Sequence, residues 1–193
     1  MTAAASHDWT MESYARLTRD LAIVKAGSST VDIDLRARVE SLLYREARLL
    51  DDGDFDQWLS LMTTDCLYWV PSTPDGGDPT TEVSLAFDDH RRLSDRVYWL
   101  HTGLVFAQIP ASRTRRIISN VEAWRGDEAG VIYARSNFLI HEFRAGRQRL
   151  LSGWYAHVLT HGHTDSLDDI RIRTKISFLT DSDQGHDNLT LVF

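Results

Sequence analysis

Four consecutive β-type segments fill most of the second half of the chain, and they constrain its fold more than any other feature. The segments cover residues 113–125, 130–143, 148–161 and 169–180. Turn residues separate them at Gly126-Asp127, at Ala145-Gly146 and over residues 162–168. Because these connections are short, neighbouring strands must run antiparallel.

The last of these segments shows the clearest alternation of apolar and polar residues. Successive side chains of a strand point to opposite faces of the sheet, so alternation predicts two faces of different polarity. The apolar set is Ile170, Ile172, Ile176 and Phe178, and the polar set is Arg171, Arg173, Lys175 and Ser177. The sequence therefore predicts that the four polar side chains share the face opposite the apolar ones.

The first half of the chain has the residue spacing of amphipathic helices. Apolar residues recur three or four positions apart in residues 11–25, in residues 35–50, after Asp54 and between residues 88 and 100. Asp32 or Asp34 is suited to cap the second helix, and Gly53 is suited to end it. Two short β-type runs, residues 66–70 and 83–87, precede the last helix.

Helices followed by a run of strands predict an α+β domain rather than alternating βα units. We expect a curved antiparallel sheet that wraps around the N-terminal helices and so buries its apolar face. Residues 1–30 are predicted to form an arm with a short helix, and residues 31–193 a single α+β domain.

Composition argues against several classes of function. The formal net charge of −7 disfavours nucleic-acid binding, which needs a basic face. No apolar run is long enough to span a bilayer, and residues 1–9 lack the basic and apolar regions of a secretory signal. We therefore expect a cytoplasmic protein with neither nucleic-acid nor membrane partners.

Metal chemistry finds few ligands in this sequence. Cys66 is the only cysteine, so this chain alone cannot build an iron–sulfur cluster or a structural zinc site. The one dense histidine cluster, His161-Gly162-His163-Thr164-Asp165, falls at a predicted hairpin tip, where supporting hydrogen bonds are scarce. A polar turn is the better interpretation, and we predict no catalytic, cofactor-binding or metal-binding residue in this chain.

General acid–base catalysis is the strongest enzymatic alternative. A curled sheet can form a conical pocket in which Tyr68, His101, His141 and His157 could transfer protons. Each of them is equally explained as part of an amphipathic strand or helix. Cys66 lies in an apolar run, where a thiol packs more often than it reacts.

Basic residues cluster in two of the predicted strands. These six residues, which we take as candidate subunit-interface residues, are Arg113, Arg115, Arg116, Arg171, Arg173 and Lys175. One interpretation is a solvated outer face. The other is a docking surface for acidic residues of a partner, because arginine and tryptophan are favoured at interface centres and the chain has six tryptophans.

A set of short motifs occurs in order between about residue 35 and residue 193. They are Tyr44-Arg45-Glu46-Ala47-Arg48-Leu49-Leu50-Asp51-Asp52-Gly53 with Phe55-Asp56-Gln57-Trp58, then Tyr68-Trp69-Val70-Pro71, Phe87-Asp88-Asp89, Pro110-Ala111-Ser112-Arg113-Thr114-Arg115, Ser136-Asn137-Phe138 and Asn188-Leu189-Thr190-Leu191. In this order they resemble the β (small) subunits of aromatic ring-hydroxylating dioxygenases, the Rieske non-haem iron enzymes.

The resemblance implies a cone-shaped fold, cystatin-like or similar to nuclear transport factor two. It implies a hexamer of three α and three β subunits, in which the β subunit is structural. The Rieske two-iron two-sulfur cluster and the mononuclear Fe(II) would belong to the α subunit, which oxygenates an aromatic substrate with O2. A reductase, often with a ferredoxin, would deliver electrons from NAD(P)H.

Three hypotheses therefore compete. The first is a non-catalytic β subunit. The second is a stand-alone isomerase, dehydratase or epoxide hydrolase of the conical fold, which requires a sealed pocket with paired ionisable groups. The third is a small-ligand binding or assembly module unrelated to oxygenases.

Overall fold

The computed structural model describes residues 10–30, 32–102, 109–161, 169–185 and 191–193. Its elements follow one another as α1 (Met11–Ala26), α2 (Ile33–Asp52), α3 (Phe55–Leu59), β1 (Met62–Pro71), β2 (Ser84–Asp89), α4 (His90–Thr102), β3 (Arg113–Arg125), β4 (Val131–Arg144), β5 (Arg147–His161) and β6 (Ile170–Leu179). The predicted α+β class is confirmed, with the four long strands within one residue of the expected bounds.

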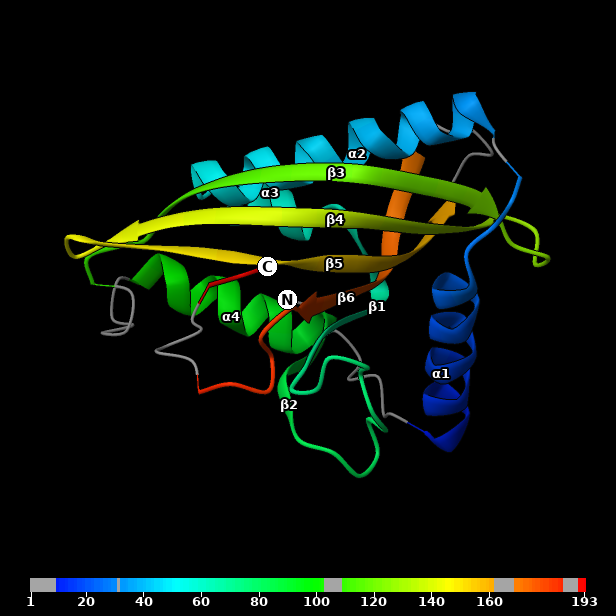
Figure 1. Cartoon of the computed structure of the whole chain (residues 1–193), viewed down its shortest axis with the longest axis horizontal. Helices are drawn as coiled ribbons and strands as arrows, with labels where there is room; N and C mark the ends of the chain where they lie inside the picture. Colours follow the sequence, from blue (N-terminus) through cyan, green and yellow to red (C-terminus); the bar gives the residue numbers. More distant parts are fainter. Residues whose placement is uncertain (1–9, 31, 103–108, 162–168, 186–190) are drawn as a thin grey trace, which may run out of the picture.

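The described strands form one curved sheet in the order β2-β1-β6-β5-β4-β3 (Figure 1). The neighbours β3, β4, β5 and β6 are antiparallel, as the short turns predict. The pair β1 and β6 is parallel, so the expectation of a purely antiparallel sheet is wrong at this position. These two strands are far apart in sequence and are joined by a long connection, which permits parallel pairing.

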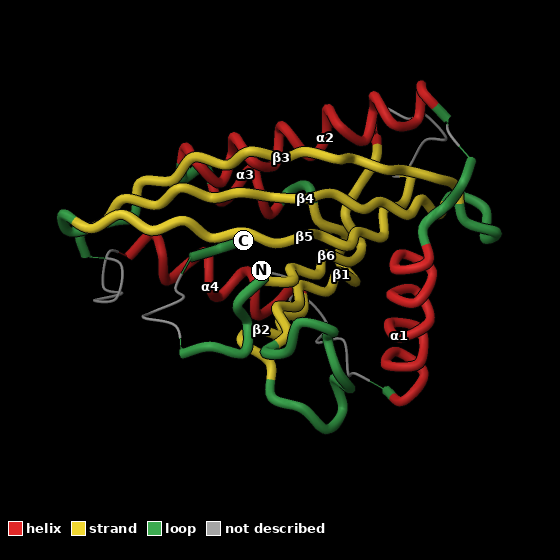
Figure 2. Tube along the Cα trace, in the orientation of Figure 1, coloured by secondary structure: helices red, strands yellow, loops and turns green. Residues whose placement is uncertain are grey.

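The two faces of the sheet are covered differently. Its inner face packs against α2 and α4 in a large core that includes Leu35, Val39 and Leu93. Its outer face is covered by α1, whose Leu17 and Leu21 belong to a second, smaller core. Figure 2 shows α2 along β3 and α1 near one end of the long strands. The sheet is therefore the middle layer of the molecule.

Helix boundaries follow the capping residues that the sequence indicates. The Asp32 carboxylate accepts a hydrogen bond from the Leu35 backbone N–H at 3.0 Å at the start of α2. Gly53, with φ of 75°, occupies the left-handed position that ends the same helix. Among the helices of the described ranges, none is both long and apolar enough to cross a membrane.

The alternation predicted for β6 is wrong in its second half. The pairing of β5 with β6 shifts between Val158 and Leu159, so β6 carries one extra residue beside Arg173. Such a bulge reverses the faces of the residues that follow. Ile172 accordingly packs in the inner core and Ile176 in the outer core. Lys175 and Ser177, predicted to share a face with Arg171, lie buried on the inner face.

Gly153 of β5 gives a direct test of this packing. A β-carbon at this position would collide with the Phe178 carbonyl oxygen and would lie 2.9 Å from Cζ of Phe138. We expect Gly153→Ala to lower the free energy of unfolding by about 2–3 kcal/mol, measured by urea denaturation. The control is Gly185→Ala, where a β-carbon meets nothing within 4 Å. Equal stability of the two variants would contradict this packing.

Candidate functional site

The four candidate acid–base residues do not converge on one site. His101 is exposed on α4, with its Nε2 3.2 Å from the Asp56 carboxylate. His141 is exposed on β4 and shares a hydrogen bond of 3.1 Å with Gln148. Only Tyr68 and His157 are buried together on the inner face. The structure thus divides the predicted set into two surface residues and two core residues.

A buried charge cluster on the inner face contains His157. We use this name for Glu46 of α2 with Lys175 and His157 of the sheet. Lys175 Nζ donates to Glu46 Oε1 at 2.8 Å, and Trp58 Nε1 donates to the same oxygen at 3.1 Å. His157 Nε2 lies 3.7 Å from Glu46 Oε2. None of the three side chains is more than 3% exposed.

The register of the sheet and the stripe of α2 bring this cluster together. His157 and Lys175 are direct partners across β5 and β6, so they share the inner face. Glu46 lies on the buried stripe of α2, three residues after Leu43 and four before Leu50. The sequence analysis missed Glu46, although an acidic residue at a position of the apolar stripe was a signal that could have revealed it.

Burial and the neighbouring charges shift the pKa values within the cluster. Burial alone would raise the pKa of Glu46, but Lys175 and His157 outweigh it and lower that pKa from 4.5 to about 2. Burial lowers the pKa of His157 below 6.5, and Glu46 opposes this only in part. At neutral pH the cluster therefore holds a carboxylate and a neutral imidazole.

The surroundings of the cluster give a substrate no described access. Tyr68 and Tyr155 pack beside it, and the ring of Phe138 stacks on Tyr155 with centroids 4.2 Å apart. Three surface grooves of about 670, 490 and 350 Å³ occur on the described part of the chain, and none is lined by a residue of the cluster. The arrangement can hold a helix on a sheet, but it offers no space for acid–base turnover.

Two further candidates for chemistry are held in unreactive forms. The Tyr68 hydroxyl accepts a hydrogen bond from the Phe193 backbone N–H at 2.9 Å, and burial raises the pKa of Tyr68 to about 12. Burial also raises the pKa of the Cys66 thiol to about 12. Neither group ionises near neutral pH, so neither is activated as a base or nucleophile.

Metal ligands do not assemble in the described ranges. Across these residues, no group of three or more His, Cys, Asp or Glu side chains is placed to hold a metal ion. Of the histidine cluster considered above, His161 ends β5, while His163 and Asp165 lie outside the described residues. The described part of the chain thus offers no site for an iron centre.

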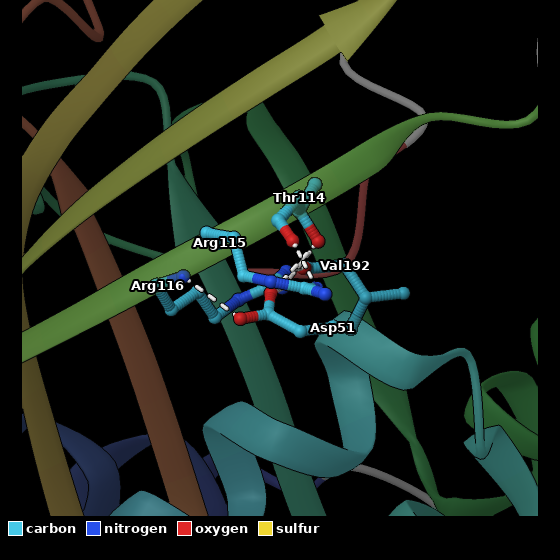
Figure 3. A network of polar contacts seen from close by, with 5 residues as sticks. All are labelled: Asp51, Thr114, Arg115, Arg116 and Val192. Atoms are coloured by element: carbon cyan, nitrogen blue, oxygen red, sulfur yellow. Dashed lines mark hydrogen bonds and ion pairs between the residues drawn. The ribbon is translucent and has the colours of Figure 1, made fainter.

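A second polar network joins α2, β3 and the last described residues (Figure 3). The Asp51 carboxylate accepts hydrogen bonds of 2.8 Å from the Thr114 hydroxyl and from the Arg116 backbone N–H. It also forms an ion pair with the Arg116 guanidinium, which donates to the Val192 carbonyl oxygen. Of the first basic run, Arg116 is therefore consumed inside the chain, whereas Arg113 and Arg115 are exposed.

The second basic run is mostly used within the chain as well. Arg173 Nη2 lies 3.6 Å from the buried Asp20 carboxylate of α1, and Lys175 belongs to the buried charge cluster. Arg171 is 40% exposed and contacts Asp169 at 3.1 Å. Two of the three side chains thus bind other elements of the same chain. Arg171, Arg113 and Arg115 retain exposed surface for a partner.

Part of the outer sheet face remains uncovered beyond α1. We call it the open face and define it by Arg113, Arg115, Ile117, Leu139, His141, Phe143 and Leu150, which share one side of β3, β4 and β5. Ile117 is 60% and Leu150 61% exposed, and the Arg113 guanidinium lies 4.6 Å from the centroid of the Phe143 ring. An exposed apolar strip with arginines has the composition of an interface.

The buried charge cluster predicts a specific loss of stability in acid. The pKa of Glu46 is lower in the folded than in the unfolded chain, so its contribution is complete above about pH 4.5 and is lost as the pH falls toward 2. His157, whose folded pKa is also lowered, acts in the same direction below pH 6.5. We expect urea denaturation to show the free energy of unfolding falling by about 3 kcal/mol or more over this range.

Removal of the ion pair should flatten this pH dependence. In Glu46→Gln combined with Lys175→Met, the part of the loss below pH 4.5 should largely disappear, because the titrating carboxylate is gone. The control, Glu12→Gln on the exposed surface of α1, should leave the pH profile unchanged. A double variant with the profile of the unaltered chain would show that the cluster does not govern acid stability.

Comparison with known proteins identifies this combination of fold and sites. The family model described as "Ring hydroxylating beta subunit" matches residues 45–179. The small oxygenase component of the p-cumate 2,3-dioxygenase system of Pseudomonas putida is 36% identical over 147 residues, which are 75% of this chain and 78% of the relative.

Solved structures agree with this match. The β subunit of benzoate 1,2-dioxygenase from Burkholderia mallei superimposes with a TM-score of 0.65 at 26% identity, covering 86% of this chain and 100% of that one. Naphthalene 1,2-dioxygenase shares the fold with a TM-score of 0.74 at 18% identity, covering 95% and 94% of the two chains. The chain belongs to the family of ring-hydroxylating dioxygenase β subunits.

Proposed function

We propose that this chain is a structural, non-catalytic β subunit that assembles with a catalytic α subunit. In this proposal the α subunit carries the Rieske cluster and the mononuclear Fe(II), and three subunits of each kind form a cytoplasmic hexamer. A reductase, with or without a ferredoxin, supplies electrons from NAD(P)H for the oxygenation of an aromatic substrate. The observation that carries the proposal is family membership, since the relatives are oxygenase β subunits.

The inner face supports a structural role over the acid–base alternative. That alternative requires paired ionisable groups in a pocket that admits a substrate. The buried charge cluster supplies the pair, but aromatic side chains pack around it and no described groove reaches it. A buried ion pair of this kind fixes how elements dock rather than performing a reaction.

The open face supports the proposed partnership. Isolated sheets bury their apolar faces, and here Ile117 and Leu150 are left exposed beside Arg113 and Arg115. A groove of about 670 Å³ next to this face is lined by both arginines, Phe55 and other apolar residues, and could receive side chains of a partner. We propose that the partner presents acidic side chains here.

Charge reversal on the open face tests the proposed contact. With a tagged α subunit, the unaltered chain should co-purify, whereas Arg113→Glu with Arg115→Glu should reduce the recovered β subunit at least tenfold, because like charges would oppose association. Arg36→Glu, on the exposed surface of α2, is the matched control and should have no effect. Failure of the unaltered chain to co-purify would overturn the function, whereas equal recovery of all variants would overturn only the contact face.

Substitution of the former acid–base candidates tests the non-catalytic role. In the assembled oxygenase, Tyr68→Phe and His101→Ala should leave product formation per iron within about twofold of the unaltered complex. Loss of a general acid or base lowers turnover by about 10²–10⁴-fold, so the two outcomes are well separated. A loss of that size in a complex that still assembles would support catalysis in this chain.

A further inference from the structure

Several buried polar atoms on the inner face lack a hydrogen-bond partner among the described residues. These atoms are Ser136 Oγ, Tyr155 Oη, His157 Nδ1 and Ser177 Oγ. The four residues are at most 1% exposed. Roughly 90% or more of buried polar groups in folded proteins are hydrogen-bonded, so four such atoms on one face call for an explanation.

The register of the sheet places these residues side by side. Tyr155 of β5 is the direct partner of Ser136 on β4 and of Ser177 on β6. His157 follows Tyr155 by two residues and therefore points to the same face. Direct cross-strand neighbours have β-carbons about 5 Å apart, a separation that one small molecule can bridge where the polar atoms themselves do not meet.

The charges around these residues indicate what kind of ligand they would bind. Glu46 is paired with Lys175, and Asp51 with Arg116, so the interior has no unbalanced charge for an ion. Hydroxyl and neutral imidazole groups can each donate or accept, which matches a ligand that does both. The stacked ring of Phe138 on Tyr155 limits the available space to something small.

We propose that the inner face holds a cluster of buried water molecules that hydrogen-bonds Ser136, Tyr155, Ser177 and His157. Buried waters usually make two to four hydrogen bonds to otherwise unsatisfied groups, and occur at about one per 27 residues. Such waters complete the hydrogen bonding of β4, β5 and β6 next to the buried charge cluster. This role is independent of the proposed function.

Removal of the two serine hydroxyls distinguishes a hydrated interior from a dry one. If water is bound, Ser136→Ala and Ser177→Ala should each lower the thermal midpoint of the full chain by about 2–4 °C, because a water loses a partner. If the hydroxyls are unsatisfied, their removal should leave the midpoint unchanged or raise it, which would overturn the proposal. Ser119→Ala, on the exposed surface of β3, is the control and should not change the midpoint.

A high-resolution crystal structure of the full chain provides the direct test. The proposal expects ordered waters within about 3.2 Å of Ser136 Oγ or Ser177 Oγ, each also bonded to a second polar atom of the inner face. Direct hydrogen bonds among these side chains, with no water between them, would overturn it. An apolar contact at both hydroxyls would do the same.

Discussion

The ion pair between Glu46 and Lys175 is the interaction on which the arrangement of α2 and the sheet depends. It crosses the inner core, and both side chains are almost completely buried. Loss of one partner from such a pair typically costs about 3–5 kcal/mol, a large share of the 5–15 kcal/mol by which domains are stable. Trp58 and His157 contact the same carboxylate, so α2, α3, β5 and β6 all meet at one charge.

Around this pair, the sheet separates two different environments. The inner face is fully covered and polar at its centre, where Glu46 and His157 meet. The outer face is covered only where α1 docks, through its apolar residues and the contact of Asp20 with Arg173 and the Tyr133 hydroxyl. The open face that remains is suited to a second chain, which is how an assembly subunit differs from a self-sufficient enzyme.

The inner face also explains why the fold alone does not determine function. A conical sheet with ionisable groups inside is a plausible reaction chamber, and one fold can support unrelated functions. Here the potential acid and base are bound to each other, and Tyr68 is bonded to the backbone of Phe193. Packing has therefore converted residue types that could perform chemistry into supports for the core.

The sequence by itself determined the α+β class, the positions of the long strands, the caps at Asp32 and Gly53, and the family, because these depend on local spacing and ordered motifs. Only the tertiary structure decided the faces of β6, the parallel pairing with β1, and the partners of Arg116, Arg173 and Lys175. One bulge beside Arg173 reverses every later side chain, and local periodicity cannot detect an extra residue. The charges then found Asp51, Asp20 and Glu46, which lie more than 60 residues away in the chain.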